Sequence, residues 1–128
     1  MYYLGKSSAA NLSGVNPLLI QVVTLALKLT SVDFGIPSSG GLRTPEQQRK
    51  LFDLKASQLD GTIKISNHQS GNAFDVFAYV DGKASWDIDH LNEVATAVLA
   101  AASQLGVKLA WGGHWKRFVD RPHFEVSK

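Results

Sequence analysis

The segment Leu18–Thr30 constrains the fold most, because it reads as an almost wholly apolar helix. Asn16 and Pro17 mark its start, as the N-cap and the first helical residue. The polar residues inside it recur at helical spacing and form one stripe: Gln21, Thr24 and Lys28. A helix with a single polar stripe is mostly buried. The rest of the chain must therefore supply elements that cover it.

Two further helices are predicted from their end signals. Thr44 and Gln47 form a capping box, and the helix that they start should run to about Ser57. A longer helix is predicted over Ile88–Leu105, with one apolar face and Gly106 as its C-terminal stop. The chain thus offers about three helices.

Strand patterns lie between these helices. A short strand is predicted at Asp33–Pro37, and apolar and other residues alternate from 74 to 79. The pair Asp81-Gly82 is a strong hairpin signal, and the last strands are predicted at Val107–Trp111 and Phe124–Val126. This order predicts an α+β fold with a small, mostly antiparallel sheet.

Length and composition exclude several classes of protein. The chain has 128 residues, of which 45% are hydrophobic and none is cysteine, so we expect a single domain over 1–128 without disulfides or cysteine-bound zinc. The net charge is only +2 and no run of like charges occurs, so no nucleic-acid partner is expected. No signal peptide and no apolar stretch of ~20 residues is visible, so we expect a protein made in the cytoplasm without stable membrane association. We also expect a monomer.

Two segments, 66–75 and 111–125, concentrate the ionisable residues that an active site needs. His68, Asp75 and His123 form a two-histidine, one-carboxylate set that suits catalytic zinc and leaves a fourth position for water. Asp120, three residues before His123, is well placed as a general base. Residue types alone leave another interpretation open, in which Asp75 caps a turn and His123 packs on the sheet.

The arrangement of these residues resembles the signature of the M15 zinc metallopeptidases. That family includes D-Ala-D-Ala dipeptidases and carboxypeptidases and phage L-alanyl-D-glutamate peptidases. The resemblance extends from about residue 11 to 126 and rests on Ser66, His68, Gly71, Ala73, Asp75, Asp120 and His123, with a softer match around Arg43 and Gln47.

The resemblance implies the fold of the D-Ala-D-Ala peptidase and hedgehog-like metallopeptidases, with His68, Asp75 and His123 as ligands of Zn²⁺. It also implies Asp120 as the catalytic base and Arg43 as the group that stabilises the oxyanion. The alternative for Arg43 is a surface ion pair with Glu46 or Asp53. Ser66 is expected to contact substrate. His114 departs from the family's pattern and is a second candidate for substrate binding, with a surface position outside the cleft as the alternative.

The activity implied is hydrolysis of the L-alanyl-D-glutamate bond of bacterial peptidoglycan by a phage endolysin. Such an enzyme reaches the wall from the host cytoplasm once the inner membrane is permeabilised, and no separate wall-binding domain is expected. Two alternatives stay open: a D-Ala-D-Ala carboxypeptidase or dipeptidase with the same metal site, and a zinc-containing wall-binding module without catalysis.

Overall fold

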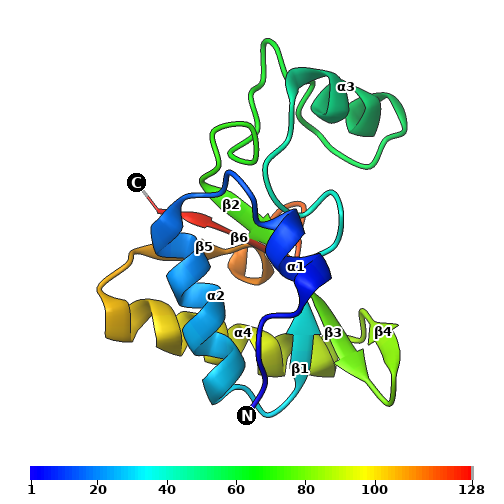
Figure 1. Ribbon diagram of the computed structural model, residues 1–128. Coiled ribbons are helices and arrows are strands. Elements are labelled where there is room, and N and C mark those ends of the chain that lie inside the picture. The colour runs from blue at the N-terminus through cyan, green and yellow to red at the C-terminus, as the bar shows by residue number, and fades with distance from the viewer. Residues whose placement is uncertain (128) are drawn as a thin grey trace.

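The computed structural model describes residues 1–127 and combines helices with two small sheets (Figure 1). In chain order the elements are α1 (Lys6–Asn11), α2 (Pro17–Leu29), β1 (Asp33–Gly35), α3 (Pro45–Asp53), β2 (Ala73–Asp75), β3 (Phe77–Val80), β4 (Lys83–Ser85), α4 (Ile88–Leu105), β5 (Leu109–Trp111), the 3₁₀ helix η1 (Gly112–His114) and β6 (His123–Val126). The α+β class predicted from the sequence is confirmed.

The core forms where α2 packs against α4, below strands β2, β5 and β6 in the view of Figure 1. Both helices contribute buried aliphatic side chains, and Phe74 and Phe124 from the strands stack over them with ring centroids 5.2 Å apart. The predicted burial of the first long helix is confirmed, because five of its residues are buried: Leu19, Val22, Val23, Ala26 and Leu27.

The strands form two three-stranded antiparallel sheets instead of the single sheet that the sequence predicts. One sheet has the order β1-β3-β4 and the other has the order β2-β6-β5. The chain passes from one sheet to the other at Val76, whose backbone N–H donates to the carbonyl of Pro122 (2.9 Å) instead of to a strand partner. The alternating pattern from 74 to 79 therefore runs through both sheets.

Strands β2 and β6 separate the candidate site from the core, which lie on opposite faces of their sheet. Asp75 is paired with His123 in the register, and Phe74 is paired with Phe124. Successive side chains of a strand point to opposite faces. The phenylalanines therefore enter the core, and the polar pair lies together on the other face.

The predicted end signals are confirmed. The Asn16 side chain accepts a hydrogen bond from the backbone N–H of Leu18 (3.0 Å), and the capping box of Thr44 and Gln47 is complete. Asp81 and Gly82 both have positive φ angles, 53° and 77°, as a tight hairpin turn requires.

Two predictions about helices were wrong. Helix α1 was not predicted, because this six-residue helix has no buried residue and no side-chain cap, and no apolar period marks it in the sequence. Helix α3 ends at Asp53 and not near Ser57, since Lys55 adopts a left-handed conformation with φ at 60°. Only Gln48 is buried in α3, so little packing holds further turns. None of the helices in residues 1–127 has the length and apolar character to cross a membrane.

Candidate metal centre

The donor atoms of His68, Asp75 and His123 converge on one point, although the three residues come from separate parts of the chain. His68 Nε2 lies 3.2 Å from His123 Nδ1 and 3.3 Å from Asp75 Oδ1. His123 Nδ1 lies 3.0 Å from the same Asp75 oxygen. Both histidines are buried, and the three residues form a possible metal-binding triad.

A loop and two strands position this triad. The pairing of β2 with β6 brings Asp75 beside His123. His68 comes from the preceding loop, where its backbone N–H donates to Ser66 Oγ (3.1 Å) and its ring Nδ1 faces the carbonyl oxygen of Gly41 (2.9 Å). A Cβ on Gly41 would overlap the carbonyl oxygen of Asn11, so only glycine fits at that place.

Arg43 joins the site through Asp75. Its backbone N–H donates to the carbonyl of His68 (3.0 Å), and Nη2 donates to Asp75 Oδ2 (3.1 Å). Nε donates to the carbonyl of Ser39 (2.8 Å), and Nη1 donates to Oε1 of the buried Gln48 (3.0 Å). The alternative ion pairs with Glu46 or Asp53 do not form in the described residues, where Asp53 pairs with Arg49 instead.

The charges in the cluster shift its ionisation. Burial opposes ionisation of Asp75, but hydrogen bonds with His123 and His68 outweigh burial and hold the pKa of Asp75 well below its usual range. Burial also disfavours a charged His123 ring, yet the carboxylates of Asp75 and Glu125 outweigh burial and raise its pKa. Without a metal, a proton on His123 therefore neutralises part of the negative charge of Asp75 and Glu125.

Asp120 is exposed to solvent, and its carboxyl lies near enough to the triad to interact with the charges of Asp75, His123 and His68. Burial of part of the side chain, followed by the negative charge of Asp75, raises the pKa of the Asp120 carboxyl. Its backbone is fixed by two hydrogen bonds: its N–H donates to the carbonyl of Gly112 (3.0 Å), and its carbonyl accepts from the N–H of His123 (3.1 Å). The turn that carries Asp120 is thus tied to the strand that carries His123.

The other predicted site residues lie outside the triad. Ser66 is buried, and its hydroxyl oxygen accepts the backbone N–H of His68. His114 is exposed in η1, with its ring edge-on to Trp111 at a centroid distance of 4.8 Å. Trp115 packs beside His123, at 5.3 Å between ring centroids. Substrate contacts by Ser66 and His114 stay predictions.

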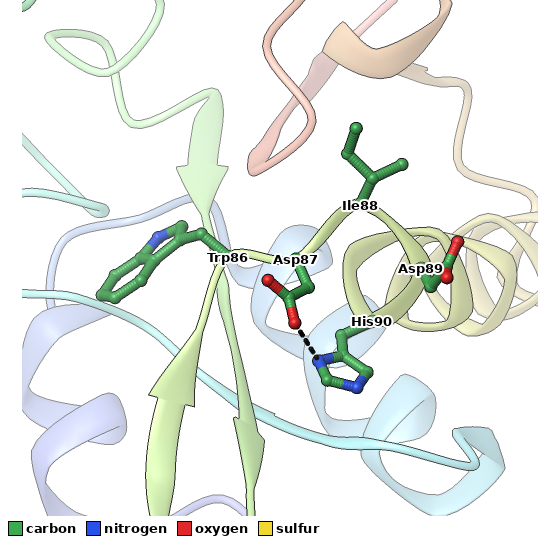
Figure 2. A pocket seen from close by; sticks show the side chains of 5 residues that line it. All are labelled: Trp86, Asp87, Ile88, Asp89 and His90. Carbon is green, nitrogen blue, oxygen red and sulfur yellow. Dashed lines mark ion pairs between the residues drawn. The ribbon is translucent and has the colours of Figure 1, made fainter.

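Two hollows lie outside the triad. A groove of about 290 Å³ adjoins Arg43 and is lined by residues of the loop before α3 and of α3 itself, among them Ser38, Leu42, Gln47, Lys50 and Leu51. A second, open hollow of about 610 Å³ lies at the start of α4 (Figure 2). There Asp87 Oδ2 lies 3.7 Å from His90 Nδ1, beside the exposed Trp86.

Comparison with known proteins identifies the family. Residues 1–126 match the phage L-alanyl-D-glutamate peptidase family. The chain belongs to that family. The fold predicted from the resemblance is confirmed by the crystal structure of Serratia marcescens L-Ala D-Glu endopeptidase ChiX, which superposes with a TM-score of 0.84 at 38% sequence identity. That match covers 95% of this chain and 87% of ChiX.

Two sequence relatives carry similar names. The L-alanyl-D-glutamate peptidase of Escherichia phage T5 is 34% identical over 128 residues, covering 99% of this chain and 90% of that protein. The peptidoglycan L-alanyl-D-glutamate endopeptidase CwlK of Bacillus subtilis (strain 168) is 29% identical over 127 residues, covering 89% of this chain and 74% of that protein. This chain is accordingly a peptidase of the same group.

The contacts that hold the triad in place were not predicted from the sequence. Glu125 accepts from His123, Gln48 and Asp75 hold Arg43, and Gly41 fixes His68. One of these had a visible signal, because Glu125 follows His123 by two residues in a strand and must share its face. The others depend on loops whose course the sequence does not reveal.

Proposed function

We propose that this chain is a zinc-dependent endopeptidase that hydrolyses the L-alanyl-D-glutamate bond of the peptidoglycan stem peptide, as a phage endolysin does. The observation that carries the proposal is the convergence of His68, Asp75 and His123 beside Asp120, in a chain of the L-alanyl-D-glutamate peptidase family. The relatives' names support this bond over the terminal D-Ala-D-Ala bond.

The donor geometry fits zinc. A tetrahedral zinc with ligands at about 2.0–2.1 Å keeps its ligand atoms roughly 3.3–3.4 Å apart. The three distances within the triad are 3.2, 3.3 and 3.0 Å, so a small outward movement of the donor atoms meets this requirement. Two nitrogens and one carboxylate oxygen are also donors that zinc prefers, and three protein ligands leave a position open for catalysis.

The hydrogen bond of His68 supports the same conclusion. Its Nδ1 faces a carbonyl oxygen, which only accepts, so a neutral His68 ring carries its proton on Nδ1 and presents the Nε2 lone pair to the triad. That lone pair meets the ionised Asp75 oxygen at 3.3 Å. Two electron-rich atoms at this distance repel each other unless a cation lies between them. A positive charge at this point relieves the repulsion, either a bound metal ion or, in the metal-free protein, the proton on His123.

The proposed chemistry divides between the metal and the chain. Bound zinc supplies Lewis acidity and lowers the pKa of a water molecule in contact with it. Asp120, which solvent reaches, takes the proton of the attacking water and passes it to the departing amine. Arg43 keeps Asp75 oriented with one N–H of Nη2. Its two remaining N–H groups, one on each terminal nitrogen, are available to a developing oxyanion.

The groove beside Arg43 is the proposed seat of the stem peptide. Leu42 and Leu51 give it apolar walls, and Lys50 adds a positive charge within it. A stem peptide that contains D-glutamate carries free carboxylate groups, which a lysine attracts. The groove thus combines apolar contact with charge complementarity next to the proposed catalytic residues.

Digestion of purified peptidoglycan, followed by mass spectrometry of the soluble fragments, tests the proposal. We expect released peptides that begin with D-glutamate, and no such peptides after treatment with a chelator. Loss of terminal D-alanine alone would identify a carboxypeptidase, and pelleting with the wall without any cleavage would identify a binding module. Either result would overturn the proposal.

A further inference from the structure

The ring of His123 lies between two carboxylates that contact its two different nitrogens. Nδ1 lies 3.0 Å from Asp75 Oδ1, on the triad side. Nε2 lies 2.7 Å from Glu125 Oε1, on the opposite edge of the ring. Glu125 follows His123 by two residues in β6, so the strand places both side chains on one face. Because Glu125 contacts Nε2, the ring nitrogen that faces away from the triad, it is not one of the proposed metal ligands.

The second oxygen of Glu125 is also held. Asn67 Nδ2 donates to Glu125 Oε2 over 2.8 Å. The backbone carbonyl of Asn67 in turn accepts from the N–H of Asn72 (3.0 Å) and from the hydroxyl of Ser70 (3.1 Å). Asn67 is therefore fixed within the loop that carries His68, and its amide connects that loop to the strand that carries His123.

We propose that Glu125, held by Asn67, is a positioning residue that makes His123 a donor through Nδ1. A neutral imidazole carries one proton and one free lone pair. Carboxylates contact both ring nitrogens, Asp75 at Nδ1 and Glu125 at Nε2. When a metal ion binds Asp75 at the triad, the carboxylate of Glu125 holds the ring's proton on Nε2 and leaves the Nδ1 lone pair for the ion. The negative charge of Glu125 also makes the ring a stronger donor.

This inference rests on the proposed metal site and extends it in one respect. His68 presents Nε2 to the triad and has its Nδ1 fixed by the carbonyl of Gly41. His123 presents the other nitrogen and is fixed by a side-chain carboxylate. The two histidines thus enter the site in opposite orientations, each set by its own outer partner. A carboxylate can be removed by substitution, whereas a backbone carbonyl cannot, so His123 gives the testable case.

Zinc affinity, measured by competition with a chromophoric chelator, tests the role of Glu125. We expect Glu125→Ala to bind zinc about 10–100-fold more weakly than the wild type. Glu125→Gln keeps a neutral acceptor and should fall between the two. Glu93→Ala is the matched control, because Glu93 also accepts from a side chain, Ser31 at 2.9 Å, but on an exposed surface. Its affinity should equal that of the wild type.

A second measurement separates positioning from general loss of structure. In ¹⁵N-histidine NMR spectra of the zinc-loaded protein, His123 should carry its proton on Nε2 in the wild type and in Glu125→Ala, because zinc occupies Nδ1. That Nε2 proton should exchange with water faster in Glu125→Ala, which lacks the carboxylate that accepts it. Asn67→Ala should weaken zinc binding in the same direction but less. Combined with Glu125→Ala it should add little, because Asn67 acts through Glu125.

The outcomes distinguish this inference from the proposed function. If the wild type binds no zinc, the proposed metal site itself is wrong. If the wild type binds zinc and Glu125→Ala binds it within twofold as tightly, the metal site stands and the positioning role is overturned. Should Glu125→Ala fail to fold, Glu125→Gln and Asn67→Ala decide the question, and wild-type affinity in both would refute the role.

Discussion

Replacing Gly112 with alanine should damage catalysis without touching any ionisable group. Gly112 accepts the backbone N–H of Asp120, and a Cβ built on Gly112 would overlap the carbonyl oxygen of Asp120. To restore normal van der Waals contact, the backbone of Asp120 must move by about 1 Å. A misplacement of roughly 1 Å at a reacting group costs on the order of 10²-fold in rate.

The assay is turnover of peptidoglycan stem peptides, with zinc content and folding measured in parallel. Gly112→Ala should lose about 10²-fold in kcat while it keeps His68, Asp75 and His123 as donors and so retains zinc. Gly5→Ala is the control, since a Cβ at Gly5 meets nothing within 4 Å, and it should match the wild type. Wild-type turnover in Gly112→Ala would refute the argument that the position of Asp120 controls the reaction.

Three further changes probe the site from other directions. Asp120→Ala should keep zinc and fold but lose about 10²–10⁴-fold in rate, and near-full turnover would exclude Asp120 as the base. Arg43→Lys should lose much of the roughly 10²–10³-fold that one oxyanion donor contributes, because lysine cannot hold Ser39, Gln48 and Asp75 together; kinetically silent Lys and Ala variants would show that Arg43 has no catalytic role. The free energy of unfolding of the metal-free protein should peak between about pH 4 and 6.5. The depressed pKa of Asp75 removes stability as the pH falls below that window, and the raised pKa of His123 removes it as the pH rises above. Urea unfolding in the presence of a chelator at several pH values measures this, and a flat profile would contradict it.

The features predicted correctly from the sequence are mostly those that neighbouring residues determine. The caps at Asn16 and Thr44 and the turn at Asp81-Gly82 depend on neighbouring residues only, and each is found where predicted. The burial of α2 follows from its single polar stripe. His68, Asp75 and His123 were candidates from residue type and spacing and were assigned as ligands from the resemblance to the M15 family, and the structure brings the three together.

What the sequence could not reveal depends on contacts between distant segments. The division of the strands into two sheets depends on a backbone hydrogen bond between Val76 and Pro122, which leaves no mark on residue types. The contact of Arg43 with Asp75 joins residues 32 positions apart. The end of α3 at Asp53 reflects how little of that exposed helix is buried, which its capping signals do not indicate.

The contacts of Glu125 show most clearly what cannot be predicted from the sequence. Its spacing from His123 predicts a shared face of one strand. The sequence does not show that Glu125 Oε1 meets Nε2 of His123, or that Asn67 occupies the other oxygen. Those contacts require the loop 66–72 to lie against β6, which is a tertiary arrangement.

Metal content of the purified protein tests the central claim most directly, because His68, Asp75 and His123 are proposed to form a zinc centre. Elemental analysis after gentle purification should give about one zinc per chain for the wild type and for Asp120→Ala. Asp75→Ala, which removes a donor and leaves the two histidines, should retain far less. A wild-type protein with less than about a tenth of an equivalent of any transition metal, even after zinc is added back, would contradict the account.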